Sequence, residues 1–148
     1  MNNFLMAIFA VLVFVSTSFA DDPMTNVFDK VDDLIIRVET GVSLNNFAET
    51  YAEMKIEYKK ALSEPGRPTN YVLNDRMKEV FKLLDKYAEL WKMQETDKFK
   101  YMKTGNRACY VEFSVYSSAY DISCEKGLVL SELKPLIEKS KSAHYNGW

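Results

Sequence analysis

The sequence predicts an all-α protein, a compact bundle of four to five helices within residues 21–148. Three observations predict this fold. Apolar residues recur at helical spacing in several successive segments. Glycine or proline separates those segments at residues 41, 65–68, 105 and 127. The longest break, 63–70, is too short to separate two domains, so we expect a single helical domain large enough to bury a core.

Residues 1–20 precede this bundle and are typical of a cleaved secretory signal peptide. Phe4 to Val15 is an unbroken apolar run, and a run of about 12 residues is shorter than the roughly 20 that a membrane-spanning helix needs. Small residues, Ser18 and Ala20, stand at the −3 and −1 positions before the expected cleavage site. We therefore expect an exported protein, periplasmic or extracellular, with no membrane span after cleavage.

Two helices joined by a tight turn are expected next. In the first, apolar residues recur over Met24–Val38, and Asp22–Pro23 suit the N-cap and the first helical position. Gly41 suits a left-handed stop at the far end, and Ser43 can cap a second helix whose apolar face runs over Leu44–Leu62. Because so few residues connect them, the two helices should be antiparallel neighbours.

Two more helices are expected in the rest of the chain. A third should run from about Tyr71 towards Tyr101, because it carries a strong apolar stripe after the proline-rich loop. Gly127 is then expected to break the chain, so that the last helix starts between Ser131 and Pro135.

The segment 108–124 fits either a helix or a β-hairpin. As a helix it would be apolar on most sides, which is typical of a buried helix. As a hairpin turning at residues 116–117 it would set Glu112 opposite Asp121, a like-charge pair, and its turn would lack glycine or asparagine. The residues therefore favour a helix here, with an irregular or hairpin-like segment as the alternative.

The two cysteines, Cys109 and Cys124, are tied to that choice. In an oxidising compartment such a pair is more often a disulfide than two free thiols. Fifteen helical steps span about 22 Å, whereas a disulfide needs Cα atoms within roughly 7 Å. A straight helix over 108–124 and a Cys109–Cys124 bond therefore exclude each other, and in the helical alternative the thiols would be free or bonded between chains.

Charge and motif content argue against several functions. With 19 basic and 21 acidic side chains and a net charge of −2, the chain has no clustered basic excess for nucleic acid or anionic membranes. The carboxylates of Glu49, Glu53 and Glu57 share one outer helix face and do not oppose each other across a cleft. There is one histidine, and no C-x-x-C or G-x-S-x-G motif. We therefore expect a non-enzymatic protein without a metal or cofactor.

An apolar ligand is the alternative that the aromatic content suggests. Side chains between the second and third helices could line a pocket for a small hydrophobic molecule, or they could be the core itself. The pocket candidates are Tyr51, Met54, Tyr58, Met77, Phe81 and Trp91.

Haem is one form of this alternative. With Met24 on the first helix and His144 on the last, the order of elements resembles that of the soluble periplasmic b-type cytochromes. The resemblance covers only element order and the end positions, and it implies haem iron held between these two side chains.

The tail supplies the candidates for a protein interface. Tyr145 and Trp148 could be exposed aromatic anchors for a partner, or they could fold back and seal the end of the bundle. With no catalytic constellation in view, we expect a small exported protein that binds another protein, as an inhibitor or an immunity factor does. The alternative is a carrier of an apolar small molecule or haem.

Overall fold

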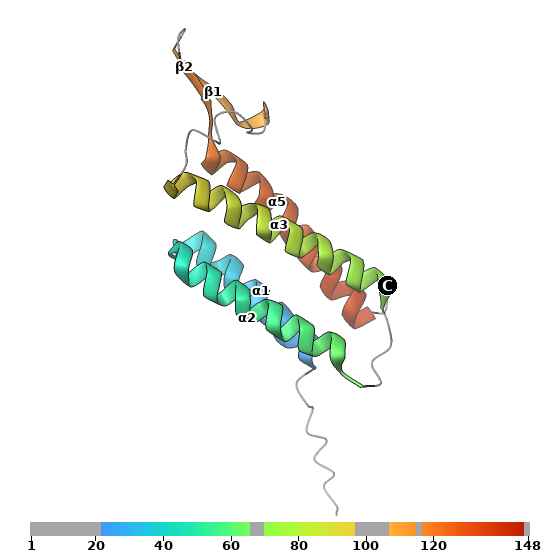
Figure 1. Cartoon of the computed structure of the whole chain (residues 1–148). Helices are drawn as coiled ribbons and strands as arrows, with labels where there is room; N and C mark the ends of the chain where they lie inside the picture. Colours follow the sequence, from blue (N-terminus) through green and yellow to red (C-terminus); the bar gives the residue numbers. More distant parts are fainter. Residues whose placement is uncertain (1–21, 66–69, 97–106, 115–116, 147–148) are drawn as a thin grey trace, which may run out of the picture.

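A computed structural model describes residues 22–65, 70–96, 107–114 and 117–146 of the chain. In this part, four helices pack as a bundle of two antiparallel pairs, which confirms the predicted all-α class (Figure 1). The first pair is α1 (Pro23–Thr40) with α2 (Leu44–Ser63), and the second is α3 (Tyr71–Thr96) with α5 (Ile122–Asn146). None of these helices is long and apolar enough to cross a membrane. The predicted signal peptide and Trp148 lie outside the described residues.

The first pair begins and ends where local signals predict. The Asp22 carboxylate accepts a hydrogen bond from the backbone N–H of Met24 at 3.1 Å, and Gly41 ends α1 with a left-handed φ of 91°. Ser43 then caps α2 by accepting a hydrogen bond from the N–H of Asn46 at 3.3 Å. Each contact satisfies a backbone group that a helix end would otherwise leave without a partner.

Asn70 starts α3 and also joins it to α5. Its side-chain oxygen accepts a hydrogen bond from the N–H of Leu73 at 2.9 Å, while its amide nitrogen donates to the carbonyl of Ala143 at 2.9 Å. The predicted start of the third helix at Tyr71 is therefore confirmed. The part of the expected helix between Thr96 and Tyr101 lies outside the described residues.

The helix favoured for 108–124 is wrong. A short 3-10 helix η1 (Arg107–Cys109) leads into an antiparallel hairpin of β1 (Tyr110–Ser114) and β2 (Ser117–Tyr120). Its register differs from that of the hairpin considered above, and Glu112 lies opposite Ser118. In this register Glu112 and Asp121 are not cross-strand partners, so the pairing that counted against a hairpin does not arise.

Asp121 lies between the hairpin and α5 and makes hydrogen bonds to α5 and to η1. Its carboxylate accepts a hydrogen bond from the N–H of Ser123 at 2.8 Å, and its carbonyl accepts one from the N–H of Glu125 at 3.1 Å. Its own N–H donates to the carbonyl of Cys109 at 2.7 Å. Asp121 therefore ends the hairpin and begins α5 at the same position.

A disulfide joins Cys109 to Cys124, with the two Cα atoms 5.6 Å apart. It links η1 to the first turn of α5, so the whole hairpin lies inside the loop that the bond closes. In Figure 1 this hairpin projects from one end of the α3–α5 pair. The disulfide and the hairpin occur together because a straight helix would have held the cysteines too far apart.

The expected break at Gly127 is also wrong, since α5 runs without interruption through Gly127 and Pro135. Glycine costs about 1 kcal/mol and proline about 3 kcal/mol in a helix interior, relative to alanine. The buried side chains Ile122, Val129, Leu133 and Ile137 recur at helical spacing and join the core of the bundle. This packing, the Asp121 cap and the disulfide outweigh the two unfavourable residues.

Gly127 offers a direct test of that balance. A Cβ added at Gly127 would have no heavy atom within 4 Å beyond its chain neighbours and the backbone of its own helix turn. We expect Gly127→Ala to raise the free energy of unfolding by up to about 1 kcal/mol, because alanine loses less backbone entropy than glycine in a helix. Urea denaturation followed by circular dichroism measures this change. A lower stability would show that the helix requires glycine at this position.

Candidate functional site

The candidate pocket residues lie between α2 and α3, where most of their rings touch. Tyr58 and Phe81 have ring centroids 5.0 Å apart, and those of Tyr51 and Phe81 are 6.3 Å apart. Met54 and Met77 are fully buried in the same core cluster, against which Tyr58, Phe81 and Trp91 pack at its edge. Contact between the rings shows that side chains already occupy this part of the bundle.

Phe47, which was not among the candidates, is at the centre of the aromatic group. Its ring centroid lies 5.8 Å from that of Tyr51, 5.7 Å from that of Tyr87 and 5.6 Å from that of Trp91. The sequence signal for this placement was its position on the apolar face of the second expected helix, four residues before Tyr51. Phe47 thus connects α2 to two successive turns of α3.

Tyr51 carries the polar contacts of this interface. Its hydroxyl donates to a carboxylate oxygen of Asp85 at 2.7 Å and lies 3.1 Å from the Phe81 carbonyl. Lys55 is 2.9 Å from the same Asp85 oxygen, and its ammonium lies 4.1 Å from the centroid of the Tyr51 ring. Burial, followed by the Asp85 contact, raises the pKa of Tyr51. A tyrosine hydroxyl is protonated at neutral pH even without this shift, and here it acts as a hydrogen-bond donor between two helices.

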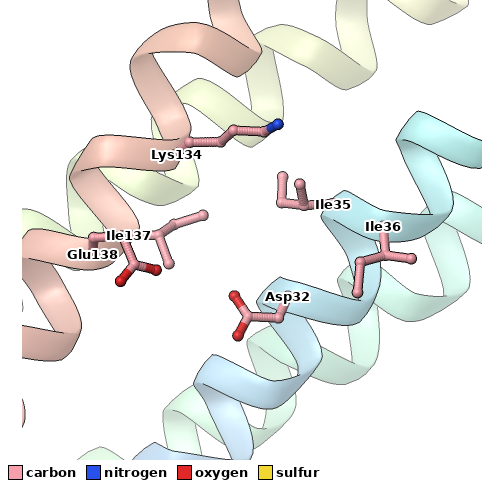
Figure 2. A pocket seen from close by; sticks show the side chains of 6 residues that line it. All are labelled: Asp32, Ile35, Ile36, Lys134, Ile137 and Glu138. Carbon is pink, nitrogen blue, oxygen red and sulfur yellow. The ribbon is translucent and has the colours of Figure 1, made fainter.

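A groove that the sequence analysis did not predict lies between α1 and α5 (Figure 2). It has a volume of about 400 Å³ and is lined by Asp32, Ile35, Ile36, Lys134, Ile137 and Glu138. Ile35 and Ile137 are buried, whereas Ile36 is 59% exposed. The groove thus combines an apolar lining with charged groups contributed by both helices.

Ion pairs connect α1 to α5 at both ends of this groove. Lys134 pairs with Glu39 at one end. At the other, the Lys141 ammonium lies 2.7 Å from a carboxylate oxygen of Asp32 and 3.1 Å from one of Glu138. Burial lowers the pKa of Lys141, but its hydrogen bonds to Asp32 and Glu138 outweigh burial and raise that pKa overall. No local pattern could have revealed the groove, because its two helices are separated by the rest of the bundle in sequence.

Tyr145 is exposed but also anchored at the opposite end of the molecule from the hairpin. Its hydroxyl lies 3.2 Å from the hydroxyl of Thr25. Its ring centroid is 4.8 Å from that of His144 and 6.4 Å from that of Phe28. The C-terminal turn of α5 is therefore held against the first turn of α1. Tyr145 can thus both close this end of the bundle and present an exposed ring to a partner.

His144, the haem-ligand candidate, already has a protein partner. Its Nε2 atom is within hydrogen-bond distance of the Asp22 carboxylate, and its ring packs 5.7 Å from that of Phe28. The other candidate, Met24, is fully buried in the core. Among the described residues, no group of three or more histidine, cysteine, aspartate or glutamate side chains is placed to hold a metal ion.

Further apolar side chains lie exposed at the same end as Tyr145. Tyr71 and Val72 are on the first turn of α3, and Leu62 is on the last turn of α2. Figure 1 shows that the start of α3 and the end of α5 lie together at this end. The hydrogen bond from Asn70 to Ala143 holds them there.

Comparison of the chain with protein-family models, curated proteins and solved structures finds no match.

Proposed function

We propose that this protein is an exported, non-enzymatic protein that binds another protein through the end of the bundle opposite the hairpin. An inhibitor or an immunity factor would act in this way. The observation that carries the proposal is the group of exposed apolar side chains at that end: Leu62, Tyr71, Val72 and Tyr145. Tyr71 is the most exposed of them, at 76%.

These side chains have the chemistry of interface anchors. Tyrosine is enriched among the residues that dominate binding energy, since its ring supplies a large contact area and its hydroxyl a hydrogen bond. The hydrogen bond from Asn70 to Ala143 holds the start of α3, which carries Tyr71 and Val72, and Tyr145 is held by its contact with Thr25. A surface held in this way loses little conformational entropy on binding, which favours affinity.

Crosslinking at Tyr71 tests the proposed surface, with Ile56, on the side of the bundle, as the control. A photoreactive amino acid at position 71 should crosslink the partner in the fluid of the protein's own compartment, whereas the same amino acid at Ile56 should not. Ile56 is the matched site because it is also exposed, on α2. Equal crosslinking at both positions would count against the proposed surface.

Affinity for the partner so identified should then depend on Tyr71. We expect Tyr71→Ser to weaken binding by about tenfold or more, the loss typical of an interface anchor, and Ile56→Ser to leave the affinity unchanged. Isothermal titration calorimetry measures both dissociation constants, and both variants should melt within a few degrees of the wild type. Unchanged affinity in Tyr71→Ser would remove α3 from the interface.

The groove between α1 and α5 favours a second candidate function, a carrier of an apolar small molecule. Its volume of about 400 Å³ falls within the roughly 300–1,000 Å³ common for small-molecule sites. Ile35, Ile36 and Ile137 supply an aliphatic lining. On this proposal, protein recovered from its native compartment should carry extra mass in a native mass spectrum, whereas a bare polypeptide mass would argue against a tightly held cargo.

A further inference from the structure

The two ends of the α1–α5 groove differ in charge. At one end Lys134 and Glu39 form a balanced pair. At the other end Asp32 and Glu138 share the single ammonium of Lys141, which leaves one negative charge in excess. The raised pKa of Lys141 has the same cause, because the two carboxylates outweigh the effect of its burial.

The two carboxylates at that end are not equally occupied. Both oxygens of Asp32 lie within 2.9 Å of the Lys141 ammonium. Glu138 contacts the same ammonium through Oε1 alone, at 3.1 Å, and its side chain is 71% exposed. Within the described residues, its Oε2 atom has no hydrogen-bond partner. One carboxylate oxygen at the mouth of the groove therefore remains able to accept a hydrogen bond from a ligand.

The apolar part of the groove adjoins this acidic end. Ile35 lies one turn beyond Asp32 on α1, and Ile137 precedes Glu138 on α5. Figure 2 shows the carboxylates of Asp32 and Glu138 on one side of the groove, with Lys134 on the other. A ligand with its charged group at Glu138 would thus lay its body along the isoleucines.

We propose that this groove binds a small amphiphilic cation, a primary amine with an aliphatic body, whose ammonium group donates to Glu138 while its hydrocarbon chain covers Ile36 and lies beside the buried Ile35 and Ile137. This inference rests on the proposed carrier function and adds the charge of the cargo. An anionic headgroup would meet the excess negative charge, and a neutral one would gain only from burial of its chain. The lining named for the groove contains no aromatic ring, so an aliphatic chain suits it better than a stacking ligand does.

Three probes with the same eight-carbon chain test the inference: octylamine, octan-1-ol and octanoate. Titrated into the whole protein at pH 7 and low ionic strength, octylamine should bind at least about fivefold more tightly than octan-1-ol, and octanoate most weakly. The preference should shrink at high salt, because exposed charges are screened. Isothermal titration calorimetry or chemical-shift titration gives the three dissociation constants.

Variants then locate the site. Glu138→Gln should weaken octylamine binding at least about threefold and leave octan-1-ol unaffected, whereas Glu132→Gln, an exposed change on the same helix, should alter neither. Ile36→Ser should weaken all three probes; since Ile36 is already exposed, this change should not unfold the protein.

The outcomes separate the inference from the function on which it rests. Equal binding of octylamine and octan-1-ol would overturn the charge preference but leave the carrier function standing. A preference for octanoate would have the same meaning. Preferred binding of octylamine that Glu138→Gln does not weaken would show that the ammonium is held elsewhere, and would also overturn the inference. If none of the three probes binds, the carrier function of this groove fails as well.

Discussion

Replacing Phe47 with alanine is expected to lower the free energy of unfolding by about 3–5 kcal/mol, the range measured for deleting a buried aromatic ring. Phe47 is only 1% exposed, and its ring contacts those of Tyr51, Tyr87 and Trp91. Removing it leaves a cavity where α2 meets α3, and these two helices belong to different pairs of the bundle. Since domains are stable by only about 5–15 kcal/mol, this loss would be a large share of the total.

Urea denaturation followed by circular dichroism measures the effect. Ile56→Ala is the matched control, because Ile56 is on the same helix but 53% exposed, and we expect it to change stability by less than about 0.5 kcal/mol. Phe47→Leu should fall between the two, since leucine refills part of the cavity. A loss below about 1 kcal/mol for Phe47→Ala would mean that Phe47 does not join the two helix pairs as described.

Removing the disulfide has the second-largest expected effect. We expect the double variant Cys109→Ala, Cys124→Ala to lose about 3 kcal/mol of stability, as a crosslink over a separation of 15 residues predicts. The bond restricts the unfolded chain, and in the native state it anchors the hairpin to α5. Because the hairpin lies inside the closed loop, its backbone amides should lose more protection from hydrogen exchange than those of α1 and α2.

Chemical denaturation without reductant measures the loss of stability, and hydrogen exchange with mass spectrometry measures protection along the chain. The wild-type protein treated with dithiothreitol is the control, and its stability should fall to about the level of the double variant. A double variant as stable as the oxidised wild type would show that η1 and the start of α5 hold together without the bond. Equal loss of protection over all four helices would contradict a local role for the hairpin anchor.

The α1–α2 pair shows which parts of this fold could be predicted from sequence. The Asp22 cap, the Pro23 start, the left-handed Gly41 and the Ser43 cap are signals within a few residues of the groups that they satisfy. A helix end depends on hydrogen bonds between near neighbours in the chain, so its chemistry can be read from a short stretch of sequence.

The segment from Arg107 to Pro135 shows what could not be predicted in this way. Residues 108–124 fit both a helix and a hairpin, and the choice depends on register, on the Cys109–Cys124 bond and on packing of α5 against α3. The continuous α5 helix has the same explanation. Its local signals at Gly127 and Pro135 indicate a break, and only burial against the rest of the bundle overrides them.

The candidate sites show the same difference between local sequence signals and tertiary contacts. The sequence by itself determined the helical class, the ends of α1 and α2, and the residue types available for binding, because these depend on spacing and on chemistry along one segment. Only the tertiary structure decided that Tyr51 and Tyr58 of the predicted pocket both contact Phe81, and that Asp32 meets Lys141, 109 positions away, beside an apolar groove. Such contacts form when helices distant in sequence bury their apolar faces together, and no short-range pattern encodes which charged groups this packing brings to the same edge.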